Sequence, residues 1–356
     1  MKKRKMMALA ICATMAIGLL AGCGGTKNNA GDNGNSAKAE QNTSSGDTVQ
    51  LSICHIASEN DPIHEGWTYF KDQLEEKSNG RFQVTIYGNK SIASSDTEAA
   101  EKVQQNIVQV TSTPSYAPAA LGGVDGYKVF DYPYLFETND DIYKFVETDL
   151  YQEWAQQLED ATGVRPLGAY SIGWLAIGTT KKDLNTIGDI KGQKIRTMST
   201  DVQMDIINAL AGSATPVNYG ELYTACQQGT VDGLMTSTGL IVSDRFYEVC
   251  KHFICPEASA NVHIPLVNAQ WYDGLDDDMK AVFDECFEDY LNYERDLQDQ
   301  FNENALQTIE DAGCTVTELS AEEKEEWKSV LNKVYEDYPD AAGPGVAAQV
   351  KEIMSK

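Results

Sequence analysis

The stretch from Gly188 to Gly239 alternates short apolar segments with amphipathic ones, and it indicates how the chain folds. Val202, Ile206 and Leu210 recur at helical spacing behind Thr200, a capping residue. Strands are predicted at Lys194–Met198, Ala214–Val217 and Val231–Met235, and helices between Thr200 and Gly212 and between Asn218 and Gly229. This β-α-β-α-β order predicts a parallel sheet with right-handed crossovers.

The first part of the chain repeats this plan. Strands are predicted at Val49–Ile56, Phe82–Ile86 and Ile107–Thr111, and helices from Pro62 to Asn79-Gly80 and after the capping residue Ser95. Two modules of this length predict two lobes that face each other across a cleft.

The remaining segments are expected to connect the two modules. Irregular chain is expected between Pro114 and Gly123, one helix at Asn139–Leu158, and strands crossing between lobes at Val164–Gly168, Trp174–Thr179 and Asn261–Asn268. A long helix from Asp276 toward Gly313 would bridge both lobes, and a helix at Ala321–Asp337 and a short terminal helix would pack on the second lobe. We therefore expect residues 49–173 plus 262–301 to form lobe I, and residues 174–261 plus 302–356 to form lobe II.

The N-terminal residues are typical of an export signal. Four basic residues at positions 2–5 precede an apolar run from Met6 to Ala21, which is shorter than the roughly 20 residues of a membrane-spanning helix. Leu20-Ala21-Gly22-Cys23 resembles a bacterial lipobox, so residues 1–22 are expected to be cleaved and Cys23 to carry a lipid. A soluble secreted protein with a chance cysteine is the alternative. The Gly-, Asn- and Ser-rich residues 23–48 are predicted to be a disordered tether.

The chain has a formal charge of −26, which becomes −30 once the four cationic residues of the signal are removed. This acidity argues against nucleic acid as a partner and against attachment to an anionic lipid surface. The negative charge also opposes the approach of an anion. Salt screens that field within about 8 Å, however, so cations close to the binding site determine whether an anion binds.

Six cysteines remain outside the signal and the expected anchor: Cys54, Cys226, Cys250, Cys255, Cys286 and Cys314. Buried free thiols and disulfides are both compatible with an exported protein. Cys250 and Cys255 are the only two that lie close in sequence. Because no CxxC pair or His/Cys cluster is present, no metal site is expected.

Arg196 is the principal candidate for binding chemistry. It lies near the carboxyl end of a predicted parallel strand, the edge at which open α/β sheets bind ligands. Its guanidinium can form two parallel hydrogen bonds to a carboxylate. A surface or structural role for Arg196 is the alternative.

A set of spaced motifs resembles the solute-binding subunits of TRAP (tripartite ATP-independent periplasmic) transporters, the C4-dicarboxylate-binding type. The motifs are KGQKIR at residues 191–196, Pro216, Glu221–Ala225, Gln228-Gly229, Val231–Gly233 and Phe246–Val249, with weaker similarity at Asp131–Phe136 and at Trp271 with Leu275. The resemblance covers about residues 50–340. It implies an α/β, two-lobed, periplasmic-binding-protein-like clamshell, in which each lobe is a mixed sheet flanked by helices and a long helix bridges the two.

The resemblance also assigns candidate site residues. It implies that Arg196 binds the substrate carboxylate and that Tyr219 lines the cleft, although Tyr219 could be a core aromatic. Thr236 stands where many members have Asn, and the usual Glu-Asn pair of the family is missing. A second Arg that many members carry near Leu175 is absent too. Trp174 could then stack on a sugar-like ligand, which favours a sugar acid or a monocarboxylate, or it could belong to the lobe core.

From the first lobe we expect neutral hydrogen-bonding roles for residues on loops after strands or at a helix start: His55, Ser58, Asp96, Thr113 and Ser115. Asp96 is equally compatible with a purely helix-capping role. His64-Glu65-Gly66-Trp67 lacks the second histidine of an HExxH motif, which argues against metal chemistry.

Together these features predict a lipid-anchored, extracytoplasmic binding protein, expected to be monomeric and to need no cofactor. It would capture a small organic acid anion, either a C4-dicarboxylate or a sugar acid such as a uronate, by hinge closure. The resemblance implies delivery to the small and large membrane subunits of a transporter. An exported hydrolase or lyase is the first alternative, but the four histidines lack partner spacing and no G-x-S-x-G elbow is present. A ligand sensor for a membrane receptor is the second alternative.

Overall fold

The computed structural model describes residues 48–355. The expected signal peptide (residues 1–22), the expected lipid-attachment residue Cys23 and all but the last residue of the expected tether lie outside these residues. No helix within residues 48–355 combines the length and the apolar character that crossing a membrane requires.

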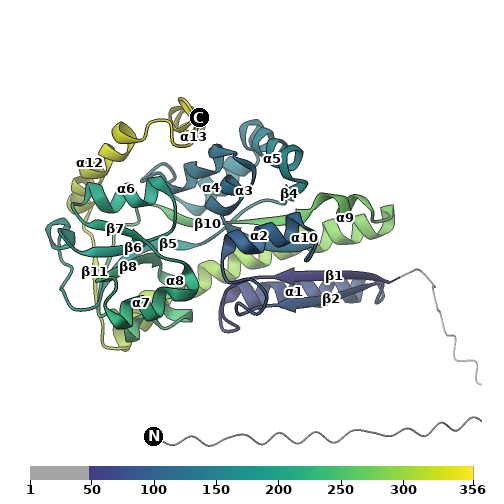
Figure 1. The fold of residues 1–356 in the computed structure, drawn as a ribbon, viewed down its shortest axis with the longest axis horizontal. Helices are drawn as coiled ribbons and strands as arrows, with labels where there is room; N and C mark the ends of the chain where they lie inside the picture. Colours follow the sequence, from purple (N-terminus) through teal and green to yellow (C-terminus); the bar gives the residue numbers. More distant parts are fainter. Residues whose placement is uncertain (1–47, 356) are drawn as a thin grey trace, which may run out of the picture. The chain divides into compact units, whose positions relative to one another are not determined.

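The strands of the described chain join in one mixed sheet whose main path runs β2-β1-β3-β10-β5-β8-β6-β7 (Figure 1). β1 pairs in parallel with β2 and β3, and β6 pairs in parallel with β7 and β8, which confirms both predicted parallel modules. The strands are β1 (Val49–Cys54), β2 (Phe82–Tyr87), β3 (Val110–Pro114), β4 (Val164–Pro166), β5 (Tyr170–Thr179), β6 (Lys194–Thr197), β7 (Ser213–Pro216), β8 (Gly233–Ser237), β9 (His252–Cys255), β10 (Ala260–Asn268) and β11 (Thr315–Glu318).

Two long antiparallel strands connect the modules. β10 pairs with β3 along its length and with the start of β5, while the rest of β5 pairs with β8 and β9. The predicted crossings at Trp174–Thr179 and Asn261–Asn268 are therefore present. The predicted crossing at Val164–Gly168 is wrong, because β4 pairs only with the far end of β10.

Helices flank each module. We call β1–β3 with α1 and α2 the first half, and β6–β8 with α6, α7 and α8 the second half. The α-helices are α1 (Pro62–Lys77), α2 (Asp96–Gln104), α3 (Tyr116–Gly122), α4 (Asn139–Val146), α5 (Asp149–Thr162), α6 (Asp201–Ala209), α7 (Leu222–Gln228), α8 (Thr238–Ser243), α9 (Ala269–Asp273), α10 (Asp277–Glu303), α11 (Ala305–Asp311), α12 (Ala321–Asp337) and α13 (Val346–Met354). Short 3₁₀ helices lie at Asp125–Asp131, Ile187–Ile190, Tyr219–Glu221 and Phe246–Glu248.

The predicted helix starts are largely found. The Ser95 side chain accepts a hydrogen bond from the Glu98 amide at the start of α2, and Thr200 accepts one from the Gln203 amide at the start of α6. Gly229 adopts a left-handed conformation that ends α7. Asn218 differs, because it forms no side-chain cap and a 3₁₀ turn precedes α7.

The long helix α10 contacts both halves. Its apolar face packs on α1, where the Trp67 ring stacks on Tyr290 with centroids 4.3 Å apart. Near its C-terminus, the Asn302 side chain accepts hydrogen bonds from the Gly239 amide (3.0 Å) and the Thr238 hydroxyl (2.8 Å) of α8. α10 has 27 residues, so it spans about 40 Å. α10 ends at Glu303 and a separate helix, α11, follows it, so the long helix is shorter than the predicted one that extends toward Gly313.

Three further expectations are corrected by the structure. The segment expected to be irregular forms α3 and the 3₁₀ helix Asp125–Asp131, because Pro118 lies in the first turn of α3, where a missing N–H breaks no helical bond. The single helix expected at Asn139–Leu158 is two helices, because Thr148 caps α5 through the Tyr151 amide. The terminal helix α13 packs on α4 and Asp125–Asp131 rather than on the second half, whereas α12 packs on α6.

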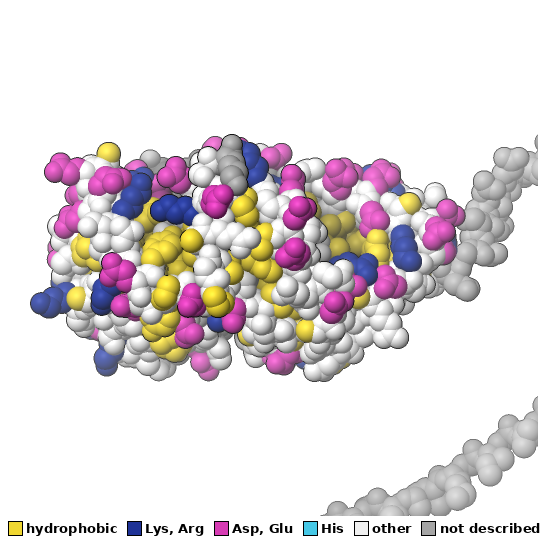
Figure 2. Space-filling view, turned by 90° about the horizontal axis from the view of Figure 1, so that it is seen from above, with side chains coloured by type: hydrophobic (Ala, Val, Ile, Leu, Met, Phe, Trp, Pro, Cys, Tyr) yellow, Lys and Arg dark blue, Asp and Glu magenta, His cyan; other side chains and the backbone are white. Residues whose placement is uncertain are grey.

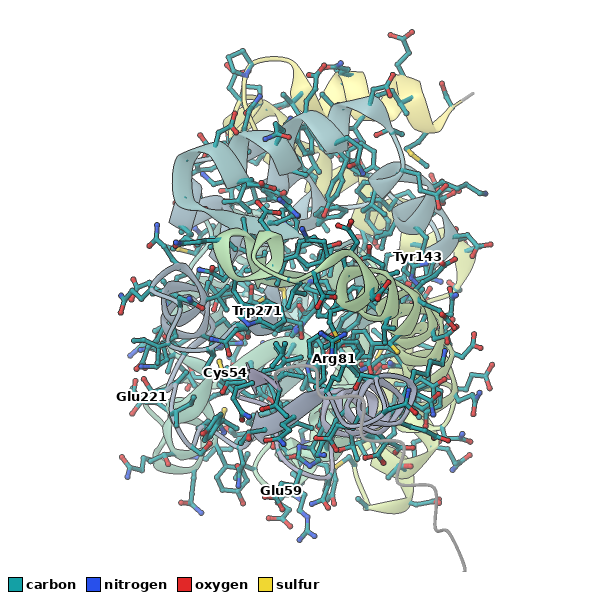
Figure 3. All side chains as sticks on the ribbon, turned by 90° about the vertical axis from the view of Figure 1, so that its right-hand side faces the viewer. Cys54, Glu59, Arg81, Tyr143, Glu221 and Trp271 are labelled. Atoms are coloured by element: carbon teal, nitrogen blue, oxygen red, sulfur yellow. The ribbon has the colours of Figure 1, made fainter. Side chains whose placement is uncertain are left out.

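Acidic side chains are spread over the face shown in Figure 2, in keeping with the strongly negative sequence. An ion pair joins Arg81, just before β2, to Asp276, the capping residue of α10, at 2.5 Å; Arg81 is labelled in Figure 3. All six cysteines of the described chain, Cys54 in Figure 3 among them, are buried free thiols. No group of three or more His, Cys, Asp or Glu side chains within residues 48–355 is arranged to hold a metal ion.

Candidate ligand-binding site

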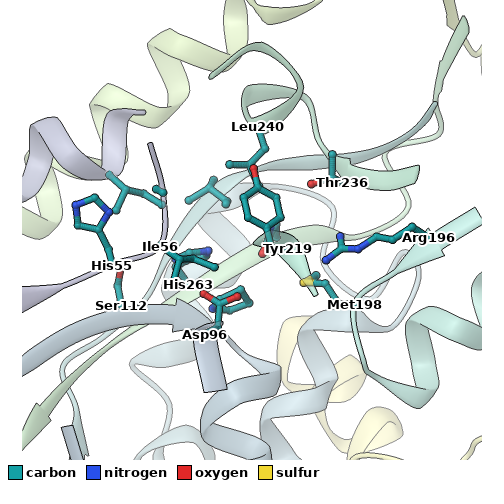
Figure 4. Close-up of a pocket in the computed structure, with 15 residues that line it drawn as sticks. His55, Ile56, Asp96, Ser112, Arg196, Met198, Tyr219, Thr236, Leu240 and His263 are labelled. Carbon is teal, nitrogen blue, oxygen red and sulfur yellow. The ribbon is translucent and has the colours of Figure 1, made fainter. Parts of the chain in front are cut away.

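A small cavity of about 30 Å³ lies where the first and second halves meet (Figure 4). Five of the nine predicted site residues line it: His55, Asp96, Arg196, Tyr219 and Thr236. They come from the end of β1, the start of α2, β6, the 3₁₀ turn after β7, and β8. The cavity thus lies at the carboxyl edges of both parallel modules, where open α/β sheets bind ligands.

Arg196 is a buried cation that has no ionic partner among residues 48–355. Its side chain is held by the two strands beside β6: Nε donates to the Val217 carbonyl (2.9 Å) and Nη1 to the Met235 carbonyl (3.4 Å). Arg81 and Arg165 pair with carboxylates, but Arg196, at 3% exposure, forms no ion pair with any described residue. Burial lowers the pKa of Arg196, although a guanidinium stays protonated in proteins. A buried, unpaired cation is costly, so this site favours an anion.

Asp96 provides the opposite charge in the cavity without pairing directly with Arg196. It is the first residue of α2, and the Tyr116 hydroxyl donates to its Oδ2 at 3.0 Å. Burial raises the pKa of Asp96 to about 6, while the Tyr116 hydrogen bond and the Arg196 charge act to lower it. Asp96 is therefore mostly ionised at neutral pH, and its charge offsets that of Arg196.

Tyr219 lies between two cations. The Lys90 ammonium is 5.4 Å from the centroid of its ring and the Arg196 guanidinium 5.9 Å. The Tyr219 hydroxyl also donates to the Asp244 carboxylate. Lys90 belongs to the first half, so Tyr219 is a point of contact between the halves as well as a wall of the cavity.

The histidines of the cavity are neutral. His55 Nε2 is 3.1 Å from His64 Nδ1, and the His263 ring lies 5.7 Å from that of Tyr170. Burial lowers the pKa of His55 and of His263 to about 3, and a neighbouring imidazole adds to the effect in each case. Neither carries a charge at neutral pH, so they offer hydrogen bonds only, in line with the predicted neutral role of His55.

Sequence reasoning missed three polar residues of the cavity: Ser112, Asn261 and His263. Ser112 lies on β3, which runs three residues further than the predicted strand Ile107–Thr111. Asn261 and His263 lie two residues apart on β10 and therefore on the same face of that strand. Their polar character within the otherwise apolar segment 260–267 was the one available signal.

Four predicted residues do not line this cavity: Ser58, Thr113, Trp174 and Ser115. Thr113 lies within β3 rather than on a loop, and alternation turns it away while Ser112 and Pro114 face the cavity. Ser115 begins α3 and its amide donates to the Val262 carbonyl. Ser58 has a buried hydroxyl with no hydrogen-bond partner among the described residues.

Trp174 lines a separate surface groove with Tyr134, Lys324 and Lys328. Ile172, two residues earlier on the same strand, does line the cavity, so strict alternation would place Trp174 beside it. Gly173 has a φ of +105°, and the β5–β10 register shifts between Ala260 and Val262. This irregularity redirects Trp174 out of the site.

Two parallel modules joined by crossing strands, with a cavity at the carboxyl edges of both, define a periplasmic-binding-protein-like clamshell. The sequence matches the family described as "Bacterial extracellular solute-binding protein, family 7" (DctP) over residues 53–340, and the chain belongs to that family, whose members serve TRAP transporters. It is 28% identical over 309 residues to the C4-dicarboxylate-binding periplasmic protein DctP of Rhodobacter capsulatus, covering 86% of this chain and 92% of that one. It is 24% identical over 311 residues to the C4-dicarboxylate-binding protein DctB of Bacillus subtilis, covering 86% and 87%.

Solved structures show the same fold. One is the sugar acid binding protein DctPAm of Advenella mimigardefordensis in complex with galactonate, with a TM-score of 0.82 and 22% sequence identity. The match covers 87% of this chain and 98% of that one. Another is a TRAP solute-binding protein of Shewanella oneidensis with bound succinate, with a TM-score of 0.80 and 21% sequence identity. The match covers 87% of this chain and 100% of that one. These relatives are described as binding proteins and not as enzymes.

Proposed function

We propose that this protein captures a small organic acid anion outside the cytoplasm and delivers it to the membrane subunits of a TRAP transporter. The observation that carries the proposal is Arg196, a buried guanidinium that lines the cavity and pairs with no carboxylate in the described part of the chain. An arginine has five N–H donors, and two of these reach the Val217 and Met235 carbonyls, which leaves three for a ligand. The relatives described as binding C4-dicarboxylates, galactonate and succinate support an acid as the ligand.

The mechanism is hinge closure of two lobes. The proposed boundaries are residues 49–173 plus 262–301 for lobe I and residues 174–261 plus 302–356 for lobe II. The cavity takes Arg196, Tyr219 and Thr236 from lobe II, and His55 and Asp96 from lobe I. A ligand that contacts both sets at once stabilises the closed state over the open one.

The protein is proposed to be a monomer held at the outer face of the membrane by a lipid on Cys23. The lipobox-like sequence before Cys23 and the polar composition of residues 24–48 support an anchor followed by a tether. Such a tether would keep the clamshell close to its membrane partners.

The test is calorimetry with the acid that stabilises the protein most in a thermal-shift screen of dicarboxylates, uronates, aldonates and 2-oxo acids. Arg196→Ala removes charge-assisted hydrogen bonds worth about 1.5–3 kcal/mol each, so its affinity should fall at least 100-fold. Arg81→Ala, which removes an arginine from the surface pair with Asp276, is the matched control and should bind normally. Unchanged affinity in Arg196→Ala would remove this residue from the binding site.

A further inference from the structure

Two polar side chains from β10 face the cavity without a partner. Asn261 and His263 are 3% and 6% exposed, and both line the cavity. Asn261 Oδ1 and His263 Nδ1 form no hydrogen bond with any described residue. Buried polar atoms are nearly always hydrogen-bonded, so two orphans on one face of one strand point to a ligand group between them.

The charges that line the cavity favour a ligand with a single negative charge. Arg196 is the only Lys or Arg among the lining residues, and Asp96 is the only Asp or Glu. A monoanion would leave the site with one excess negative charge, whereas a dianion would leave two. Lys90 lies 5.4 Å from the centroid of the Tyr219 ring but does not line the cavity.

The chemistry of an amide further restricts the group that meets Asn261. An amide presents one acceptor oxygen and an NH₂ donor, whichever way round the side chain lies. A hydroxyl can donate to the oxygen and accept from the NH₂ group, and it can also pair with either tautomer of His263. A second carboxylate only accepts, so it would leave the acceptor oxygen of Asn261 unsatisfied.

Apolar side chains make up much of the rest of the cavity wall, beside the polar His55, Ser112, Tyr219 and Thr236. Ile56 and Ile63 come from the first half, Ile172 from β5 and Leu240 from α8. The isoleucines and Leu240 offer no hydrogen bonds, so hydroxyl groups placed against them would lose water without replacement. A hydrocarbon body suits this wall.

We propose that the ligand is a monocarboxylate that carries one hydroxyl group and a hydrocarbon body, such as a branched hydroxy acid, rather than a dicarboxylate or a polyhydroxylated sugar acid. Its carboxylate binds Arg196, its hydroxyl binds Asn261 and His263, and its hydrocarbon part packs on the isoleucines and Leu240. This inference rests on the proposed function and narrows its substrate class.

The first experiment compares ligand classes by calorimetry on the purified protein. The panel contains branched 2-, 3- and 4-hydroxy monocarboxylates, their deoxy analogues, succinate, malate and galactonate. The best hydroxy monocarboxylate should bind at least tenfold more tightly than succinate, malate and galactonate. If one of those three binds best, the inferred class is wrong while the proposed function stands; if no acid binds, both are wrong.

The second experiment couples the ligand hydroxyl to Asn261. In the unaltered protein, the deoxy analogue of the best ligand should bind about tenfold more weakly than the hydroxy acid. Asn261→Ala should bind the hydroxy acid about tenfold more weakly than the unaltered protein does, and should bind the deoxy analogue equally well, because only the hydroxyl reaches the amide. Asn292→Ala, on the exposed side of α10, is the control and should leave both affinities unchanged. An equal loss for both ligands in Asn261→Ala would contradict the proposed contact.

Discussion

The Ser243 hydroxyl donates a 2.7 Å hydrogen bond to Asp61 Oδ2 and so joins α8 of the second half to the start of α1 in the first. Asp61 is also the capping residue of α1, where its Oδ1 accepts from the Ile63 amide at 3.0 Å. Both elements border the cavity, through Ile63 and Leu240. The Ser243–Asp61 bond is therefore a direct contact between the two halves.

Ser243→Ala should weaken ligand binding without touching the ligand. The variant removes one hydrogen bond between the two proposed lobes, which the proposed hinge opening would break, so affinity should fall about fivefold, or about 1 kcal/mol. Calorimetry measures this loss of affinity. A ligand that dissociates more slowly from the variant than from the unaltered protein would contradict the account. Ser355→Ala, near the C-terminus, is a control that should behave as the unaltered protein does.

Asp61→Asn should change how stability depends on pH. Burial raises the pKa of Asp61 from 3.8 to about 6, which the Ser243 and Ile63 hydrogen bonds only partly offset and the nearby Asp244 reinforces. The folded state therefore binds this proton more tightly than the unfolded state, and the stability it confers is lost as pH rises from about 4 through 6. Asparagine keeps the helix cap and cannot ionise.

We therefore expect Asp61→Asn to be more stable than the unaltered protein at pH 7.5, by about 1–3 kcal/mol. The two should converge below about pH 4, where the folded and the unfolded states of the unaltered protein both hold the proton. Chemical denaturation at several pH values measures this. A difference that grows as pH falls would have the wrong sign and would contradict the burial of an ionisable Asp61.

Gly173→Ala tests the irregularity that turns Trp174 away from the cavity. Gly173 has a φ of +105°, which side chains rarely adopt, and a Cβ there would lie 2.3 Å from Asn302 Oδ1. That oxygen accepts the Gly239 amide that ties α10 to α8. The variant should lose about 2–4 kcal/mol of stability.

Gly192→Ala is the matched control for this substitution. Gly192 also has a positive φ, +73°, but a Cβ there would meet nothing within 4 Å. It should lose only about 1–2 kcal/mol, the strain of the left-handed conformation alone. Equal losses of unfolding free energy in the two variants would show that the contact with Asn302 does not matter.

The comparison of sequence and structure separates local from non-local information. The caps at Ser95 and Thr200, the left-handed Gly229 and the position of Arg196 at a strand edge follow from neighbouring residues, and the sequence predicts them. The break at Thr148 was also local, but the apolar spacing that continues through it outweighed the capping signal.

The polar part of the cavity wall that β3 and β10 provide does not follow from neighbouring residues in this way. Which face of β3 or β10 lines the cavity depends on their pairing with each other and with β5, which is set by residues far apart in sequence. A boundary shift of three residues in β3 was enough to exchange Thr113 for Ser112. For the same reason, only the position of β10 in the sheet shows that Asn261 and His263 face the cavity.

The central claim is that Arg196 is a cation kept unpaired for an anionic ligand, and Arg196→Met tests it most directly. Methionine fills similar space without the charge, so the ligand-free variant should unfold at the same temperature as the unaltered protein or higher. Addition of the acid that stabilises the unaltered protein should leave the unfolding temperature of the variant unchanged. The account would be contradicted by a variant that unfolds at a much lower temperature without ligand, yet whose unfolding temperature the acid raises as much as it does for the unaltered protein.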